Sequence, residues 1–267
     1  MIRCGIIGCG NMGGAMLRQM LKAGVFQPEE VCAADRNEAL LRALQAETGV
    51  CVTDDNARAA AVPLLILALK PQFMESAVAP IRDRIAKDAL IISIAAGYDL
   101  NKLRALVGNE DAHIVRVMPN TPAMVGAGVL AACRSESVTK EEWACAAGIL
   151  QSMGLMIEVP ENQMDAVTGM SGSSPAFVFL FMEALADAGV RGGLPRADAL
   201  KMAAQVIMGC GKLALETGKH PGQLKDMVTS PAGTTIEGVA VLEKRGFRGA
   251  VMEAVEAATE RSKALRG

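Results

Sequence analysis

The chain has 267 residues, of which 51% are hydrophobic and 21% are charged, and its formal net charge is −2. That length suffices for one large domain or two moderate ones with real cores. Because this charge balance provides no basic field for nucleic acid or an anionic membrane, we expect a small-molecule substrate and neither of those partners.

The cysteine and histidine content bears on compartment and metal binding. The seven cysteines contain no C-x-x-C motif, so we interpret them as small core residues in a reducing, cytoplasmic compartment. His113 and His220 do not lie near a cysteine pair, and no metal site is expected. The most apolar helical stretch, about residues 177–185, is interrupted by Glu183 and Asp187 and is predicted to be too short to cross a bilayer.

A glycine turn near the start of the chain predicts a dinucleotide site. An apolar run at residues 2–7 leads into Gly8-x-Gly10-x-x-Gly13 and then a helical pattern over residues 11–23. The first glycine allows a tight turn, the second lets the backbone approach a pyrophosphate, and the third lets the helix pack on the strand. The alternative is an ordinary flexible turn. A strand this close to the first residue leaves no room for a signal peptide.

The second predicted strand, residues 31–34, ends at Asp35, which lies 22 residues after Gly13. An acid at that distance binds the ribose hydroxyls of NAD in such folds. The next residue, Arg36, is able to pair with the 2′-phosphate of NADP instead. A solvated Asp-Arg pair is the structural alternative, and the sequence leaves NAD and NADP both open.

Three further strands, at residues 64–69, 90–94 and 113–117, end at polar or small residues. Their carboxyl ends meet at the edge of a parallel sheet, where ligands bind. The residues placed there are Lys70, Pro71, Ala95, Ala96 and Asn120. For Lys70 the alternative is a solvated strand end, for the alanines a plain turn, and for Asn120 an Asx turn.

This pattern predicts an α/β fold in two parts. Residues 1–160 form an N-terminal Rossmann-type, doubly wound and mostly parallel sheet that binds the dinucleotide. Residues 161–267 contain only helical patterns, several of them apolar on most sides. Because so small a segment cannot cover those faces by itself, we expect an all-helical domain that forms at least an obligate dimer.

Residues 225–238 are the most informative stretch of the second part. Thr234-x-x-Glu237 has the form of a capping box, so a helix is predicted to begin at about Thr235 after a loop of small residues. The backbone N–H groups of such a helix start can hold a carboxylate, and the Thr235 hydroxyl adds a directed donor. The alternative is an ordinary capped helix start.

Taken together, these motifs resemble the pyrroline-5-carboxylate reductase family in order and over nearly the whole chain. The shared stretches are the glycine turn at residues 8–14, RVMPNTP at 116–122, GSSPAF at 172–177 and VTSPAGTT at 228–235. The resemblance implies reduction of the cyclic imine Δ1-pyrroline-5-carboxylate to L-proline, the last step of proline synthesis, with NADPH or NADH as hydride donor. It also implies a homodimer through the helical domain, and in many members a ring of dimers.

The resemblance further implies a role for each site residue. The pyrophosphate is expected at Gly8, Cys9, Gly10, Asn11, Met12 and Gly13. The adenosine end is expected at Asp35 and Arg36, and the nicotinamide side at Lys70, Pro71, Ala95, Ala96 and Asn120. The substrate is expected at Ser230, Gly233, Thr234 and Thr235, with Thr235 the catalytic candidate.

Two other functions are considered beside this one. A β-hydroxyacid dehydrogenase shares the arrangement of domains, but relies on a lysine in the first helix of the second domain, and residues 175–182 contain none. A non-catalytic NAD(P)-sensing dimer is the other alternative.

Overall fold

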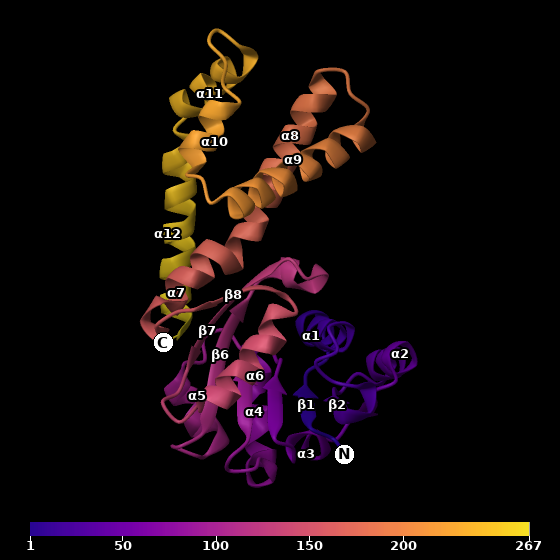
Figure 1. Ribbon diagram of the computed structural model, residues 1–267. Coiled ribbons are helices and arrows are strands. Elements are labelled where there is room, and N and C mark those ends of the chain that lie inside the picture. The colour runs from indigo at the N-terminus through magenta and orange to yellow at the C-terminus, as the bar shows by residue number, and fades with distance from the viewer. Residues whose placement is uncertain (267) are drawn as a thin grey trace. The chain divides into compact units, whose positions relative to one another are not determined.

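The computed structural model describes residues 1–266 and divides into two compact units (Figure 1). The first comprises Met1–Gly172 together with the chain from Ala258 onward, and the second comprises Ser173–Ala257.

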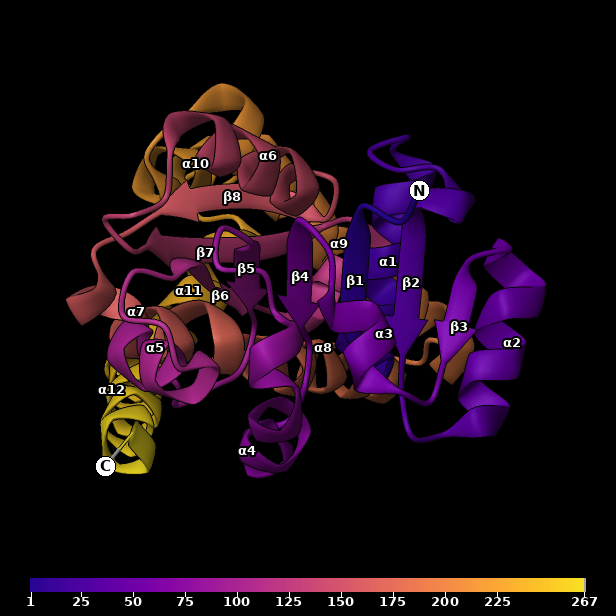
Figure 2. The same ribbon diagram turned by 90° about the horizontal axis from the view of Figure 1, so that it is seen from below.

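The first unit is built on an eight-stranded sheet with strand order β3-β2-β1-β4-β5-β6-β7-β8 (Figure 2). All neighbouring strands are parallel except β6 and β7. The strand order reverses between β1 and β4, which creates the crevice where ligands of open α/β sheets bind. The strands are β1 (Cys4–Ile7), β2 (Val31–Ala34), β3 (Cys51–Thr53), β4 (Leu64–Leu67), β5 (Leu90–Ser93), β6 (His113–Pro119), β7 (Gly128–Arg134) and β8 (Gly154–Glu158).

Helices cover both faces of this sheet, as expected for a doubly wound fold. One face packs against α1 (Asn11–Lys22), α2 (Glu38–Thr48) and α6 (Lys140–Gln151). The other packs against α3 (Asn56–Ala60), α4 (Pro71–Val78) and α5 (Leu100–Val107). Alternate residues of one strand enter opposite cores: Ile6 of β1 lies in the first cluster and Ile7 in the second. Burial on both sides explains why the central strands β1 and β4 are uniformly apolar.

Short helical turns connect these elements. They are η1 (Pro28–Glu30), η2 (Ala79–Arg84), η3 (Thr121–Val125) and η4 (Glu161–Gln163). The chain then continues through α7 (Met164–Val167), which still packs on the sheet: Met164 is fully buried in the second cluster. Ser262, near the C-terminus, donates a hydrogen bond to Asp165 in α7 at 2.8 Å. The compact units therefore divide at residue 172, whereas the domain boundary predicted from the sequence lies at residue 160.

The helix that enters the second unit differs from the sequence-based expectation. A π-helical segment, Thr168–Ser173, runs directly into α8 (Ser174–Arg191), and no side chain caps the start of α8. Glu161–Arg191 is thus one helical run of 31 residues, and an 18-residue window within it has a mean hydropathy of 1.3. The expectation that this region is too short to span a bilayer is wrong. Among residues 1–266 it is the one helix with the length and composition to do so, a test that core helices of soluble proteins also pass.

The second unit consists of helices only. It contains α9 (Arg196–Thr217), α10 (Pro221–Met227), α11 (Thr234–Lys244) and most of α12 (Phe247–Arg266). The contact of α8 with α9 buries only small residues fully, Ala186, Ala199 and Ala203. Many large apolar side chains of this unit are exposed, among them Leu180 at 69% and Leu215 at 75%. So much exposed apolar surface is typical of an interface with another protein.

Candidate functional site

The glycine turn between β1 and α1 has the geometry that its sequence predicts. Gly8 has a φ of +96°, and a Cβ added to it would lie 2.5 Å from the carbonyl oxygen of Ala68. A Cβ on Gly13 would collide with the carbonyl oxygen of Gly8. A Cβ on Gly10, by contrast, would meet no atom within 4 Å. Gly8 and Gly13 are therefore required by the turn and the packing, while Gly10 faces open space that a phosphate can enter.

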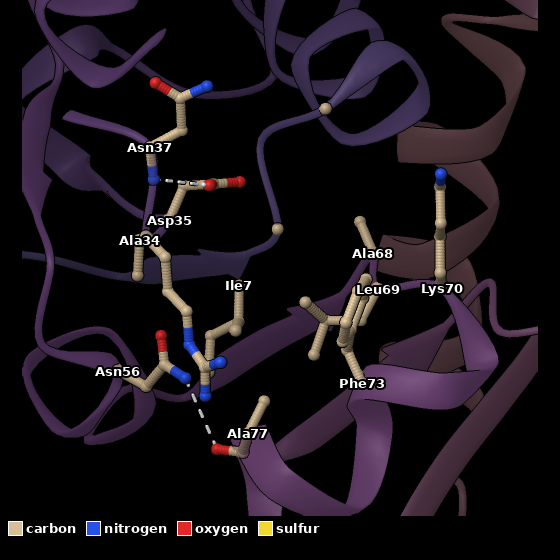
Figure 3. Close-up of a pocket in the computed structure, with 13 residues that line it drawn as sticks. Ile7, Ala34, Asp35, Asn37, Asn56, Ala68, Leu69, Lys70, Phe73 and Ala77 are labelled. Carbon is tan, nitrogen blue, oxygen red and sulfur yellow. Dashed lines mark hydrogen bonds between the residues drawn. The ribbon is translucent and has the colours of Figure 1, made fainter. Parts of the chain in front are cut away.

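Asp35 joins the tip of β2 to this turn. One carboxylate oxygen accepts the backbone N–H of Cys9 at 2.8 Å. The other accepts the N–H of Asn37 at 2.9 Å (Figure 3). The thiol of Cys9 points away into the core, where it lies 3.4 Å from the carbonyl oxygen of Ala34 and is 3% exposed. Cys9 can therefore offer a ligand only its backbone.

A pocket of about 410 Å³ opens beside this turn (Figure 3). It brings together Gly8, Gly10, Asp35, Arg36 and Lys70 of the residues predicted from the sequence. Sequence analysis missed the other lining residues, which are Ile7, Ala34, Asn37, Asn56, Ala68, Leu69, Phe73 and Ala77. The most informative are Asn56, which donates to the carbonyl oxygen of Ala77 at 3.3 Å, and Phe73, an aromatic ring that is 49% exposed.

Only part of this set was detectable in the sequence. Phe73 follows Lys70-Pro71 by two residues, so an aromatic side chain in the first turn after a strand end was a usable signal. Asn56 gives no such signal, because an Asn beside Asp55 is typical of a helix cap.

Arg36 and Lys70 give the pocket a positive rim. Both side chains are exposed, and neither makes a hydrogen bond or ion pair with any of residues 1–266. By contrast, Arg18 on α1 is bound through two bonds of 2.7 Å to Glu47. Two cations without anionic partners at the mouth of a pocket favour a phosphorylated ligand.

The remaining predicted cofactor residues lie outside this pocket. Asn11, exposed at the start of α1, lines a second pocket of about 480 Å³ with Cys9 and Gly10, while Met12 is half-buried. Pro71 is the exposed first residue of α4. Ala95 is buried and Ala96 exposed in the turn after β5.

The side chain of Asn120 forms hydrogen bonds within the protein. Its side-chain amide donates to the carbonyl oxygen of Ser171 at 3.2 Å and accepts the N–H of Val129 at 2.9 Å. The residue is 8% exposed. It fastens β7 and the π-helical segment to the end of β6, which leaves one N–H and one lone pair of the amide for any ligand. Its contact with nicotinamide stays a prediction.

The predicted substrate residues lie in the second unit, in the loop before α11 and in the first turn of α11. Helix α11 begins at Thr234 with Gly233 as its N-cap, so the expected capping box of Thr234 with Glu237 is absent. A Cβ on Gly233 would collide with the Ser230 hydroxyl, which packs against that glycine. Because glycine has no side chain, the first N–H groups of α11 receive no side-chain cap from this position.

The same loop holds strained backbone. Ala232 has a φ of +55° and is the only non-glycine residue among residues 1–266 with a positive φ. A non-glycine residue in this region costs about 1 kcal/mol or more, and such residues concentrate at functional sites. Thr235, in the first turn of α11, is half-buried, and its hydroxyl makes no hydrogen bond within the described chain. This donor is therefore available to a ligand.

A doubly wound sheet with an open glycine turn, a pocket at its carboxyl edge and unpaired cations there defines a dinucleotide-dependent oxidoreductase. Comparisons with known families agree. A profile described as NADP oxidoreductase, coenzyme F420-dependent, matches residues 3–97, and the pyrroline-5-carboxylate reductase dimerisation profile matches residues 161–265. The chain belongs to the pyrroline-5-carboxylate reductase family.

Individual relatives extend this similarity over the full length. The chain is 46% identical to pyrroline-5-carboxylate reductase of Methanosarcina acetivorans, across 98% of this chain and 97% of the relative. It resembles the Coxiella burnetii enzyme structure with a TM-score of 0.91 and 34% identity, covering 97% of each chain. The Plasmodium falciparum enzyme, solved with NADP bound, gives a TM-score of 0.88 and 33% identity and covers 100% of this chain and 98% of its own.

Proposed function

We propose that this protein reduces the cyclic imine Δ1-pyrroline-5-carboxylate to L-proline with NADPH or NADH. The observation that carries the proposal is the full-length similarity to pyrroline-5-carboxylate reductases at 46% identity. The site residues add chemical support, because a dinucleotide cradle and a helix start suited to a carboxylate occur in one chain.

The chain's own groups have a limited chemical task. Bound NADPH or NADH supplies the hydride, which adds to the carbon of the protonated C=N bond and leaves a secondary amine. We infer that the free N–H groups at the start of α11, with Ser230, hold the substrate carboxylate. The Thr235 hydroxyl contacts the ring nitrogen. Its oxygen accepts the N–H of the protonated imine, and its O–H donates to the lone pair that appears on the nitrogen as hydride adds. No strong general acid is needed, because a protonated imine already carries the charge that makes its carbon electrophilic.

Different residues at the pocket are expected to bind different parts of the cofactor. We infer that Gly10 admits the pyrophosphate, since nothing in the chain occupies the space beside it. The carboxylate of Asp35 retains lone pairs for a ribose hydroxyl after accepting two backbone N–H groups. Arg36 has no internal partner and suits the 2′-phosphate of NADPH.

Assembly and location follow from the same proposal. The helical domain pairs with a second copy, which covers the exposed apolar side chains of α8 and α9. We therefore assign the apolar run Glu161–Arg191 to a protein interface and not to a bilayer, and the protein to the cytoplasm. Larger rings of dimers are compatible with this pairing. A clean monomeric mass in sedimentation at micromolar concentration contradicts it.

The activity has a direct test. The purified protein is mixed with NADPH and Δ1-pyrroline-5-carboxylate, and absorbance of the reduced cofactor is followed. We expect oxidation of the cofactor and formation of L-proline. Oxidation of a β-hydroxyacid with NADP⁺, and no reaction with the imine, identifies the dehydrogenase alternative. Cofactor binding without either reaction identifies the sensing alternative.

A further inference from the structure

Two thiols lie opposite each other on neighbouring strands, outside the cofactor pocket. Cys32 in β2 and Cys51 in β3 are register partners in the parallel pair at one edge of the sheet. Their sulfur atoms are 3.6 Å apart, and the Cys32 thiol donates a weak hydrogen bond to Cys51. The proposed reductase chemistry uses neither residue.

Both side chains lie on the same face of the sheet. Cys32 belongs to the cluster formed with α3 to α5, and Cys51 packs against that cluster. Cys4 on β1 and Cys9 in the turn after it belong to the cluster on the opposite face. Cys32 is 3% exposed, whereas Cys51 is half-buried, so a small reagent reaches Cys51 first.

The spacing of this pair meets the requirements of a disulfide. Neighbouring strands lie about 4.8 Å apart, within the roughly 4.4–6.8 Å that disulfides span between Cα atoms. To bond, the two sulfurs must close from 3.6 Å to about 2.05 Å. Cys51 is half-buried, so its side chain has room to rotate toward Cys32.

We propose that Cys32 and Cys51 form a reversible disulfide when the protein meets a peroxide. The Cys51 thiol gives up its proton and its sulfur attacks one oxygen of the peroxide. The O–O bond breaks, which leaves a sulfenic acid on Cys51 and a hydroxide that takes up the thiol proton to become the first water. Cys32 then attacks the sulfenic sulfur, forms the S–S bond and releases the second water. Both thiols are oxidised, the peroxide is reduced, and a dithiol reductant reverses the reaction.

The bridge would fasten an edge strand that is otherwise weakly held. Strand β3 has only three residues, paired to β2 alone. At the end of this strand, the Thr53 carbonyl oxygen accepts the N–H of Asp35 over a long distance of 3.3 Å. Disulfides in reducing compartments are usually transient and redox-sensing, which fits a pair with one accessible sulfur.

The proposal is tested by mass spectrometry on the Cys145→Ser/Cys210→Ser variant, which removes the two exposed thiols. After treatment with hydrogen peroxide under native conditions, we expect a loss of 2 Da that dithiothreitol reverses. Trypsin should release residues 23–36 linked to residues 43–58, since each of these peptides contains one cysteine. Amide hydrogen exchange at residues 51–53 should slow in the oxidised form.

Three further variants in that background locate the bridge. Cys32→Ser and Cys51→Ser should each abolish the loss of 2 Da, whereas Cys133→Ser, which removes a buried thiol elsewhere, should keep it. The proposal is overturned if excess peroxide leaves both thiols free, or if Cys51→Ser still forms a bridge through Cys9. If the disulfide forms but amide hydrogen exchange at residues 51–53 does not slow, the inference that the disulfide stabilises β3 is wrong.

Discussion

The Asp35 carboxylate accepts the backbone N–H of Cys9 at 2.8 Å, which ties the tip of β2 to the glycine turn after β1. Its second oxygen accepts the N–H of Asn37 at 2.9 Å. The acid that the sequence suggests for ribose binding is thus also a structural brace of the phosphate turn. We therefore expect loss of its charge to affect both the shape of the turn and the affinity for the cofactor.

The variant Asp35→Asn tests this double role. An amide can turn only one oxygen toward the two backbone donors, so one N–H is left unpaired or faces an NH₂ group. We expect a loss of about 1–3 kcal/mol in the free energy of unfolding and a higher KM for both NADH and NADPH. Urea denaturation and steady-state kinetics measure the two effects. Unchanged stability contradicts the bracing role.

Arg36→Ala tests the origin of any preference for NADPH. Removing a guanidinium that pairs with a phosphate costs about 1.5–3 kcal/mol, so we expect kcat/KM with NADPH to fall roughly 10- to 100-fold. Activity with NADH should change less than about threefold. Arg42→Ala is the matched control, since Arg42 is an exposed arginine that pairs with Glu38 on α2. Equal losses with both cofactors would show that Arg36 does not contact the 2′-phosphate.

Thr235→Ala tests the proposed hydrogen bond to the ring nitrogen. Loss of a hydroxyl that interacts with the ring nitrogen mainly in the transition state should lower kcat about tenfold or more and change the KM for the imine little. Thr235→Ser keeps the hydroxyl and should recover most of the rate. A kcat/KM within about twofold of the original protein for the alanine variant rules out this role.

Glu161→Gln tests a buried charge pair that holds the start of the helical run to the sheet. The Arg116 guanidinium is 4% exposed and lies 3.1 Å from the Glu161 carboxylate, which also accepts the Leu100 N–H at 2.7 Å. Because the variant leaves Arg116 buried without a counter-charge, we expect a loss of about 2–4 kcal/mol in unfolding free energy.

The control for that variant is Glu158→Gln, which breaks the more exposed pair with Arg134 at 3.3 Å. A surface pair contributes at most about 1 kcal/mol. Denaturant unfolding compares the two variants at one pH and ionic strength. Equal losses would mean that burial does not decide the contribution of Glu161.

Cys133→Ala tests the alkaline limit of stability. Burial raises the pKa of the Cys133 thiol to about 11, above its ordinary value of 9.0. The unfolded chain then releases this proton at a lower pH than the native protein does. The contribution of Cys133 is therefore complete below about pH 9 and falls as the pH rises toward 11. Unfolding free energies measured from pH 8 to 11 should decline less steeply in the variant; an identical slope contradicts this assignment.

The sequence alone determined the sheet and the glycine turn at its edge. Strands buried on both faces are continuous apolar runs, and Gly8 and Gly13 occupy positions where backbone geometry excludes a side chain. These are local constraints, so they can be detected in a single sequence. The family motifs likewise indicated the substrate class, which the comparisons with relatives bear out.

Only the tertiary structure decided which side chains converge. Asn56 and Phe73 enter the pocket through the packing of α3 and α4, which no local pattern encodes. The side-chain amide of Asn120 forms hydrogen bonds with Ser171 and Val129, which lie 51 and 9 residues away in sequence. Cys32 and Cys51 lie opposite each other because of the register in which β2 pairs with β3. Each of these relationships requires segments separated in sequence to pack together, and their distances are set by the fold, not by spacing along the chain.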